Sequence, residues 1–163
     1  MNPGAGDRFR EESDRIRTFF IRPFFLSVTI GMPFCAYKFL FGTAALRYGG
    51  EGSPLLFFGW FVIAWAAVDL LMNAGRAIFD GAGREAPFEY CTLAQAGRMF
   101  RMPMVFLAID TFLSFSIICC MLWSGWISLL TPFESYLWYG ATTLNLLSLS
   151  IVSLYNEIAK VRA

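Results

Sequence analysis

Three charged side chains interrupt otherwise apolar stretches of this sequence, and these are the residues best able to carry chemistry. They are Lys38, Asp69 and Asp110. An ionisable group in an apolar helix is costly unless it is paired or faces a polar path, so it raises a functional hypothesis by default. Lys38 lies near one end of its stretch beside Tyr37. We expect its long side chain to reach the outer headgroups there.

The two aspartates belong to a wider set of polar candidates. Asp69, Asn73 and Arg76 follow one another at i, i+4 and i+7, which places them on one face of a helix. Asp110 lies on the next apolar stretch at a similar depth, and Asn145 lies near the middle of the last one. One hypothesis is a polar seam that admits an ion or a proton partway from the inner side. The other hypothesis is structural pairing of each aspartate with an arginine of the inner surface, such as Arg22, Arg76 or Arg101.

Other catalytic chemistry has little support in the sequence. There is no histidine, and therefore no histidine general base, metal ligand or haem ligand. No nucleotide-binding loop, catalytic triad or metal-ligand spacing is present. We therefore expect a protein that is not an enzyme, with no cofactor or metal beyond bound lipids. The four cysteines form no C-x-x-C pair and are interpreted as small apolar core residues: Cys35, Cys91, Cys119 and Cys120.

Four apolar stretches must position these side chains. Hydrophobic residues make up 57% of the 163 residues and charged residues only 15%, below the roughly 25% charged residues of soluble domains. A helix needs about 20 apolar residues to cross a bilayer. The sequence predicts a single all-α integral membrane domain over 1–163, with four transmembrane helices in two antiparallel hairpins. The predicted spans are approximately 23–45, 54–74, 103–130 and 136–155, and Gly31 and Pro33 predict a disturbed backbone inside the first.

The distribution of basic residues predicts the orientation. Eleven of the thirteen lysines and arginines lie before the first span, between the second and third spans, or after the fourth. The outer loops contain only Arg47. Cytoplasmic segments carry such an excess, so both termini are expected inside. Net charge is only +1, which gives no electrostatic reason to expect nucleic acid as a partner.

Two segments are expected on the inner surface as short amphipathic helices, 7–22 and 80–101. The first mixes four acids with five arginines, which is unlike a targeting peptide. In the second, Thr92-Leu93-Ala94-Gln95 has the form of a capping box. The arginines of the first segment are the candidate partner-binding residues: Arg8, Arg10, Arg15 and Arg17.

Three functions fit this architecture. The first is a non-catalytic accessory or structural subunit of a larger membrane complex of respiratory or photosynthetic type, hence a role in electron transport, with other membrane subunits and the lipid bilayer as partners. The second is a small homo-oligomeric ion channel or transporter that uses Asp69 and Asp110. The third is a membrane-bound sensor or assembly factor. No soluble substrate is evident. The expected location is an energy-transducing inner membrane, either the bacterial cytoplasmic or the mitochondrial inner membrane.

Overall fold

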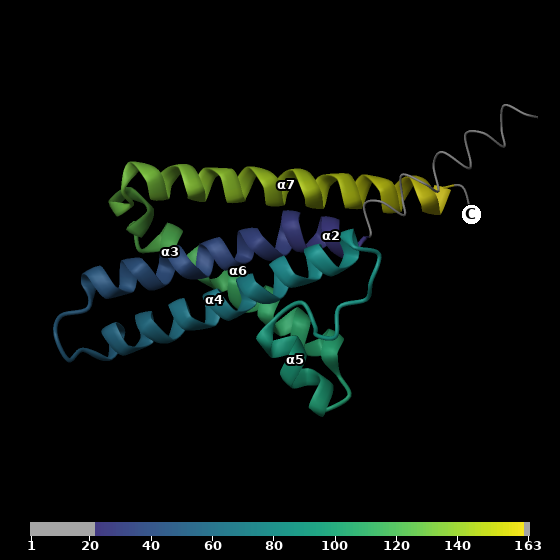
Figure 1. Ribbon diagram of the computed structural model, residues 1–163. Coiled ribbons are helices and arrows are strands. Elements are labelled where there is room, and N and C mark those ends of the chain that lie inside the picture. Colours follow the sequence, from purple (N-terminus) through teal and green to yellow (C-terminus); the bar gives the residue numbers. More distant parts are fainter. Residues whose placement is uncertain (1–21, 162–163) are drawn as a thin grey trace, which may run out of the picture.

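The computed structural model describes residues 22–161, and this part of the chain is helical without any strand (Figure 1). Four helices are long and apolar enough to cross a membrane, which makes this a multi-pass, all-α membrane protein. The expected inner-surface segment 7–22 lies outside the described residues except for Arg22, and so do the four candidate partner-binding residues Arg8, Arg10, Arg15 and Arg17. The four long helices occupy Pro23–Tyr48, Pro54–Gly81, Pro103–Trp123 and Pro132–Tyr155.

The first crossing is a composite helix. It consists of α2 (Pro23–Leu26), a π-helical stretch η1 (Ser27–Gly31) and α3 (Met32–Tyr48). Pro33 cannot donate a backbone hydrogen bond, and its ring crowds the carbonyl one turn earlier. The wider π turn directly before it accommodates this defect. The backbone disturbance expected at Gly31 and Pro33 therefore takes the form of a π-helical stretch inside a continuous helix.

The second crossing is α4 (Pro54–Gly81), and it continues seven residues beyond the predicted boundary at Ala74. Proline occupies its first turn, where a missing N–H costs nothing, and the Ser53 hydroxyl accepts a hydrogen bond from the Leu56 amide as N-cap. Nothing in residues 75–81 breaks a helix, because Gly75 and Gly81 weaken it but do not stop it. The helix therefore extends as far as the Gly83 turn, where φ is 69°.

The third crossing, α6 (Pro103–Trp123), is shorter than the predicted 103–130. Gly125 adopts a left-handed conformation with φ 73°, which ends an α-helix. A 3-10 turn, η2 (Trp126–Leu129), then leads into the last helix.

The fourth crossing, α7 (Pro132–Val161), begins four residues before the predicted start at Tyr136. Thr131 and Glu134 form a reciprocal capping box there. The Glu134 amide donates to the Thr131 hydroxyl, and the Thr131 amide donates to the Glu134 carboxylate. Residues 132–135, which lie outside the predicted fourth span, therefore form the first turn of α7.

α3 is the central helix of the bundle. It packs against α4, α6 and α7, and Figure 1 shows α4 and α7 on opposite sides of it. The core cluster joins α3, α6 and α7 through Phe34, Tyr37, Leu40, Met121, Trp138 and Ala141. α3 and α4 approach closely at two glycines, since a Cβ on Gly42 would lie 2.6 Å from Ile63 and 3.0 Å from the Gly59 carbonyl oxygen. Such small residues let membrane helices pack backbone to backbone.

The connection between the second and third crossings contains α5 (Thr92–Met99), which packs on α6. The capping-box pattern predicted Thr92 as the N-cap of α5, but the N-cap is Cys91. Thr92 does not cap the helix because its amide and its hydroxyl both donate to Asp69. Gln95 does not close the box either, and its side-chain oxygen accepts a hydrogen bond from the Glu89 amide.

Candidate functional site

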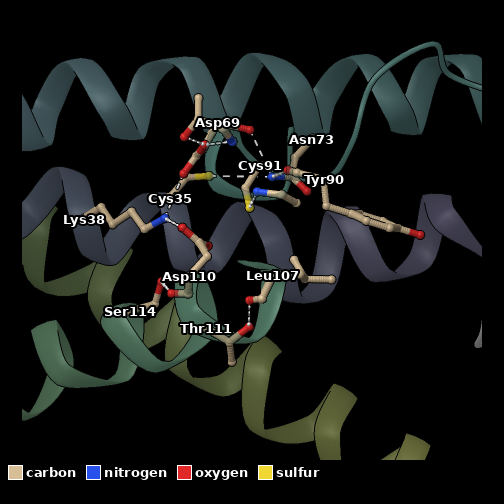
Figure 2. Close-up of polar contacts among 12 residues, drawn as sticks. Cys35, Lys38, Asp69, Asn73, Tyr90, Cys91, Leu107, Asp110, Thr111 and Ser114 are labelled. Carbon is tan, nitrogen blue, oxygen red and sulfur yellow. Dashed lines mark hydrogen bonds and ion pairs between the residues drawn. The ribbon is translucent and has the colours of Figure 1, made fainter. Parts of the chain in front are cut away.

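Lys38 is buried at the centre of the bundle between two aspartates of different helices. Its Nζ lies 2.7 Å from Asp69 Oδ2 on α4 and 2.6 Å from Asp110 Oδ1 on α6. Figure 2 shows the lysine side chain extending from α3 to meet both carboxylates. The Trp65 ring lies 4.0 Å from the same nitrogen, which adds a cation–π contact. We call Lys38, Asp69 and Asp110 the charge triad.

The second oxygen of Asp69 connects the charge triad to α5. Asp69 Oδ1 accepts hydrogen bonds from the Thr92 amide at 2.7 Å and the Thr92 hydroxyl at 2.8 Å. The amide belongs to the first turn of α5, where unpaired N–H groups and the helix dipole favour a negative charge. The charge triad and Thr92 therefore join α3, α4, α5 and α6 in one buried network.

Asn73 extends this network toward the loop before α5. Its side-chain nitrogen donates to the Asp69 carbonyl and to the Tyr90 carbonyl, both at 2.9 Å. Its Oδ1 is buried without a hydrogen-bond partner and faces Gly31, where an added Cβ would lie 2.0 Å from that oxygen. A larger residue at position 31 would therefore collide with the Asn73 side chain, so this position requires glycine.

Two expectations about these charges are wrong. Lys38 does not extend to the outer headgroups, because only 1% of it is exposed and its ammonium group is held by two carboxylates inside the bundle. The aspartates pair with this lysine and not with an arginine of the inner surface. Two carboxylates on neighbouring helices attract the nearest cation that can reach both, and the long Lys38 stem reaches them from α3.

The remaining polar candidates lie outside the charge triad. The Arg76 guanidinium donates to the Phe88 carbonyl at 2.7 Å and lies 3.8 Å from the Tyr90 ring centroid. Asn145 on α7 is buried near Tyr37, whose hydroxyl donates to Thr142. The expected seam through Asp69, Asp110 and Asn145 is therefore divided into two separate polar groups.

A cavity of about 390 Å³ borders the charge triad. Asp69, Asn73 and Asp110 line one side of it together with Lys38 and Tyr90. The other walls are mainly apolar and come from the first halves of the first and third crossings: Leu26, Ile30, Phe34, Met104, Leu107 and Thr111. The charge triad thus borders a cavity whose remaining walls are mainly apolar.

Two thiols also line this cavity. Cys35 and Cys91 are buried, as expected for small apolar core residues, whereas Cys119 and Cys120 are exposed on α6, contrary to that expectation. Cys91 lies in the connection before α5, next to Asp110. Burial, together with the nearby negative charge of Asp110, raises the pKa of the Cys91 thiol to about 12. This thiol is therefore neutral at physiological pH and is a poor nucleophile.

The charge triad carries a net negative charge when both of its carboxylates are ionised. One lysine faces two aspartates, so one of the three charges lacks an opposite partner within the triad. The Thr92 hydrogen bonds and the start of α5 partly compensate Asp69. The Asp110 carboxylate has less support and retains 7% exposure of its side chain where it lines the cavity. The arrangement can therefore hold a proton or a cationic group at Asp110.

Sequence reasoning missed Thr92 and Cys91 as members of the site, and it gave the two aspartates an arginine partner in place of Lys38. The signal for Lys38 was present, since it is the single cation set against two acids within the apolar stretches. No periodicity marks Thr92, because it lies on a connecting segment whose path depends on tertiary packing.

Comparisons of the chain with protein-family models, with curated proteins and with solved structures find no match.

Proposed function

We propose that this chain is a non-catalytic structural or accessory subunit of a larger membrane assembly, of the respiratory or photosynthetic kind that supports electron transport in an energy-transducing inner membrane. The charge triad is the observation that supports this proposal. Lys38 pairs with both aspartates, and Asp69 also accepts a hydrogen bond from Thr92, so this network ties four helices together. Large apolar side chains face outward on the long helices, among them Phe57, Phe112, Trp123 and Phe133. Neighbouring subunits and lipid are the partners suited to such faces.

The proposed topology places both termini on the inner side and arranges the spans as two antiparallel hairpins. The excess of arginine in the inner segments supports this orientation. The short connection of residues 49–53 between α3 and α4, which pack closely, supports the first hairpin. The inner segment 7–22 would then lie where it can contact another polypeptide through Arg8, Arg10, Arg15 and Arg17.

Native electrophoresis in mild detergent, followed by mass spectrometry, tests this proposal. The intact chain should migrate with other membrane proteins in a fixed ratio. Deletion of residues 1–17 should leave the four helices inserted but lower the occupancy of those partners. The control is Arg84→Gln, which removes one exposed inner arginine outside the deleted segment. A monomeric intact protein, or a truncated chain at full occupancy, would contradict the proposal.

The second candidate is a small ion channel or transporter, and the net negative charge of the triad beside a cavity favours it. In that case Asp110 would release and accept a cation or a proton. Asp110→Asn distinguishes the two functions, because it leaves a neutral Lys38–Asp69 pair that should still fold. Purified protein in proteoliposomes would be assayed for proton and sodium flux. Flux that is present in the native chain and lost in a folded Asp110→Asn variant would support transport.

A further inference from the structure

We infer that the cavity beside the charge triad is a binding site for an apolar molecule that carries a protonated amine. This inference does not depend on the assembly proposed above. It rests on the chemistry of the apolar walls of the cavity and of its polar side.

The walls define the body of the ligand. The walls away from the charge triad are mainly aliphatic or aromatic, and they come from α2, η1, the start of α3 and the first half of α6: Leu26, Ile30, Phe34, Met104 and Leu107. The volume of about 390 Å³ falls within the roughly 300–1,000 Å³ of pockets that hold small organic ligands. The apolar part of a cavity of this size favours an alkyl chain or a ring over water.

The polar side defines the head group. Lys38 already uses its ammonium group on two carboxylates and the Trp65 ring, so it has little capacity left for an anion. Asp110 keeps part of its carboxylate open to the cavity. A carboxylate in an apolar surrounding is stabilised most by a cation that also donates hydrogen bonds. A protonated primary amine supplies both, whereas a carboxylate would be repelled.

Dodecylamine is a suitable probe, with dodecanol and dodecanoate as controls of the same chain length. Thermal unfolding would be measured in nanodiscs of phosphatidylcholine. Near a hundredfold excess over its dissociation constant, dodecylamine should raise the Tm by about 5–10 °C. Dodecanol should raise it less, and dodecanoate should not raise it. Equal effects of all three would overturn the inference.

Two matched variants separate the cavity from general partition into the bilayer. Leu107→Trp fills the cavity, and Leu113→Trp places the same ring on the exposed side of α6. The amine should still stabilise the Leu113→Trp variant but not the Leu107→Trp variant. Similar shifts in both variants would overturn the inference. Asp110→Asn should abolish the preference for dodecylamine over dodecanol, and a preference that persists would also overturn it.

Native mass spectrometry of the unmodified chain provides a readout that does not depend on variants. Dodecylamine should bind at one saturable site, whereas binding that grows without saturation would contradict the inference. Nanodiscs that contain phosphatidylethanolamine distinguish the natural source of the amine. A higher Tm in these discs, with no further gain from dodecylamine, identifies a membrane lipid as the source. An unchanged Tm with a full response to dodecylamine identifies a free apolar amine.

Discussion

Among single side chains, Lys38 is the one on which most of the buried network depends. Without its ammonium group, two carboxylates on adjacent helices would face each other away from water. Removing one partner of a buried charge group leaves an uncompensated charge, which costs more than the interaction itself contributed. Mutations of Lys38 should therefore act on stability before they act on anything else.

We expect Lys38→Met to destabilise the folded protein by about 3–5 kcal/mol. The double variant Lys38→Met/Asp110→Asn should recover part of this loss, because it leaves a single carboxylate held by Thr92 and the start of α5. Thermal unfolding in detergent measures both effects. The control is Arg47→Met, which breaks a partly exposed ion pair with Glu134 and should cost no more than about 1 kcal/mol. A Lys38→Met variant as stable as the native chain would show that the charge triad does not hold the bundle together.

Cys91 provides a pH-dependent test of burial beside the charge triad. Its pKa is raised from 9.0 to about 12 mainly by burial, so folding favours the neutral thiol. The corresponding stability is fully present below pH 9 and is lost as the pH rises from 9 towards 12.

The test uses a variant in which Cys91 is the single cysteine, with Cys35, Cys119 and Cys120 replaced by alanine. Its reaction rate with iodoacetamide should still rise about tenfold per pH unit between pH 9 and 11 in the folded protein. The same chain unfolded in detergent should reach a plateau above pH 9. A plateau near pH 9 in the folded state would place the thiol in water.

At the scale of the helices, the close approach of α3 and α4 depends on glycine. Gly42→Ala would place a methyl group 2.6 Å from Ile63 Cγ1 and 3.0 Å from the Gly59 carbonyl oxygen. We expect a loss of about 1–3 kcal/mol, because the backbone oxygen cannot move aside. Gly140→Ala on α7 is the matched control, since nothing lies within 4 Å of an added Cβ there. It should be neutral or slightly stabilising. Equal behaviour of the two variants in thermal unfolding would argue against tight packing at Gly42.

The existence of the four long helices could be predicted from the sequence, but some of their ends could not. Apolar length and proline at the start identify each crossing, because a bilayer demands about 20 apolar residues whatever the fold. The end of α6 at Trp123 depends on the left-handed Gly125, and apolar side chains continue beyond it to Leu130. Hydropathy averages over this turn and therefore misses it. The start of α7 is marked in the sequence, since Thr131-x-x-Glu134 has the form of a capping box, but the predicted span followed apolar length and began at Tyr136.

The charged residues of the site could also be identified from the sequence, while their pairing could not. Charges within apolar stretches are conspicuous, which is why Asp69 and Asp110 were candidates. Their partner depends on the rotation of α3 against α4 and α6, and no one-dimensional pattern encodes that rotation. Thr92 joins the site for the same reason, because the path of the connection brings the start of α5 to Asp69.

For the whole molecule, the orientation in the membrane is the property most open to direct measurement. We expect cysteines introduced at Gly50 and Ser128 to react with an impermeant maleimide from the outside, and a cysteine at Arg84 only after permeabilisation. All three positions are exposed. The background would have the four native cysteines replaced by alanine. Ser128 is preferred to Glu134 as a probe position, because Glu134 is bound by Arg47 and Thr131. Labelling of position 84 in intact cells would reverse the proposed topology.

The position of the charge triad along the chain also has a consequence for biogenesis. Lys38 lies on the first of the four long helices in residues 22–161, and its acidic partners follow 31 and 72 residues later. A lone lysine deep in a nascent helix opposes lateral release from the translocon by up to about 3 kcal/mol. We therefore expect the first helix to remain at the translocon until the second brings Asp69 beside it, so that the two enter the lipid as a pair. Asp110 and the start of α5 would complete the charge neutralisation only when the third helix arrives.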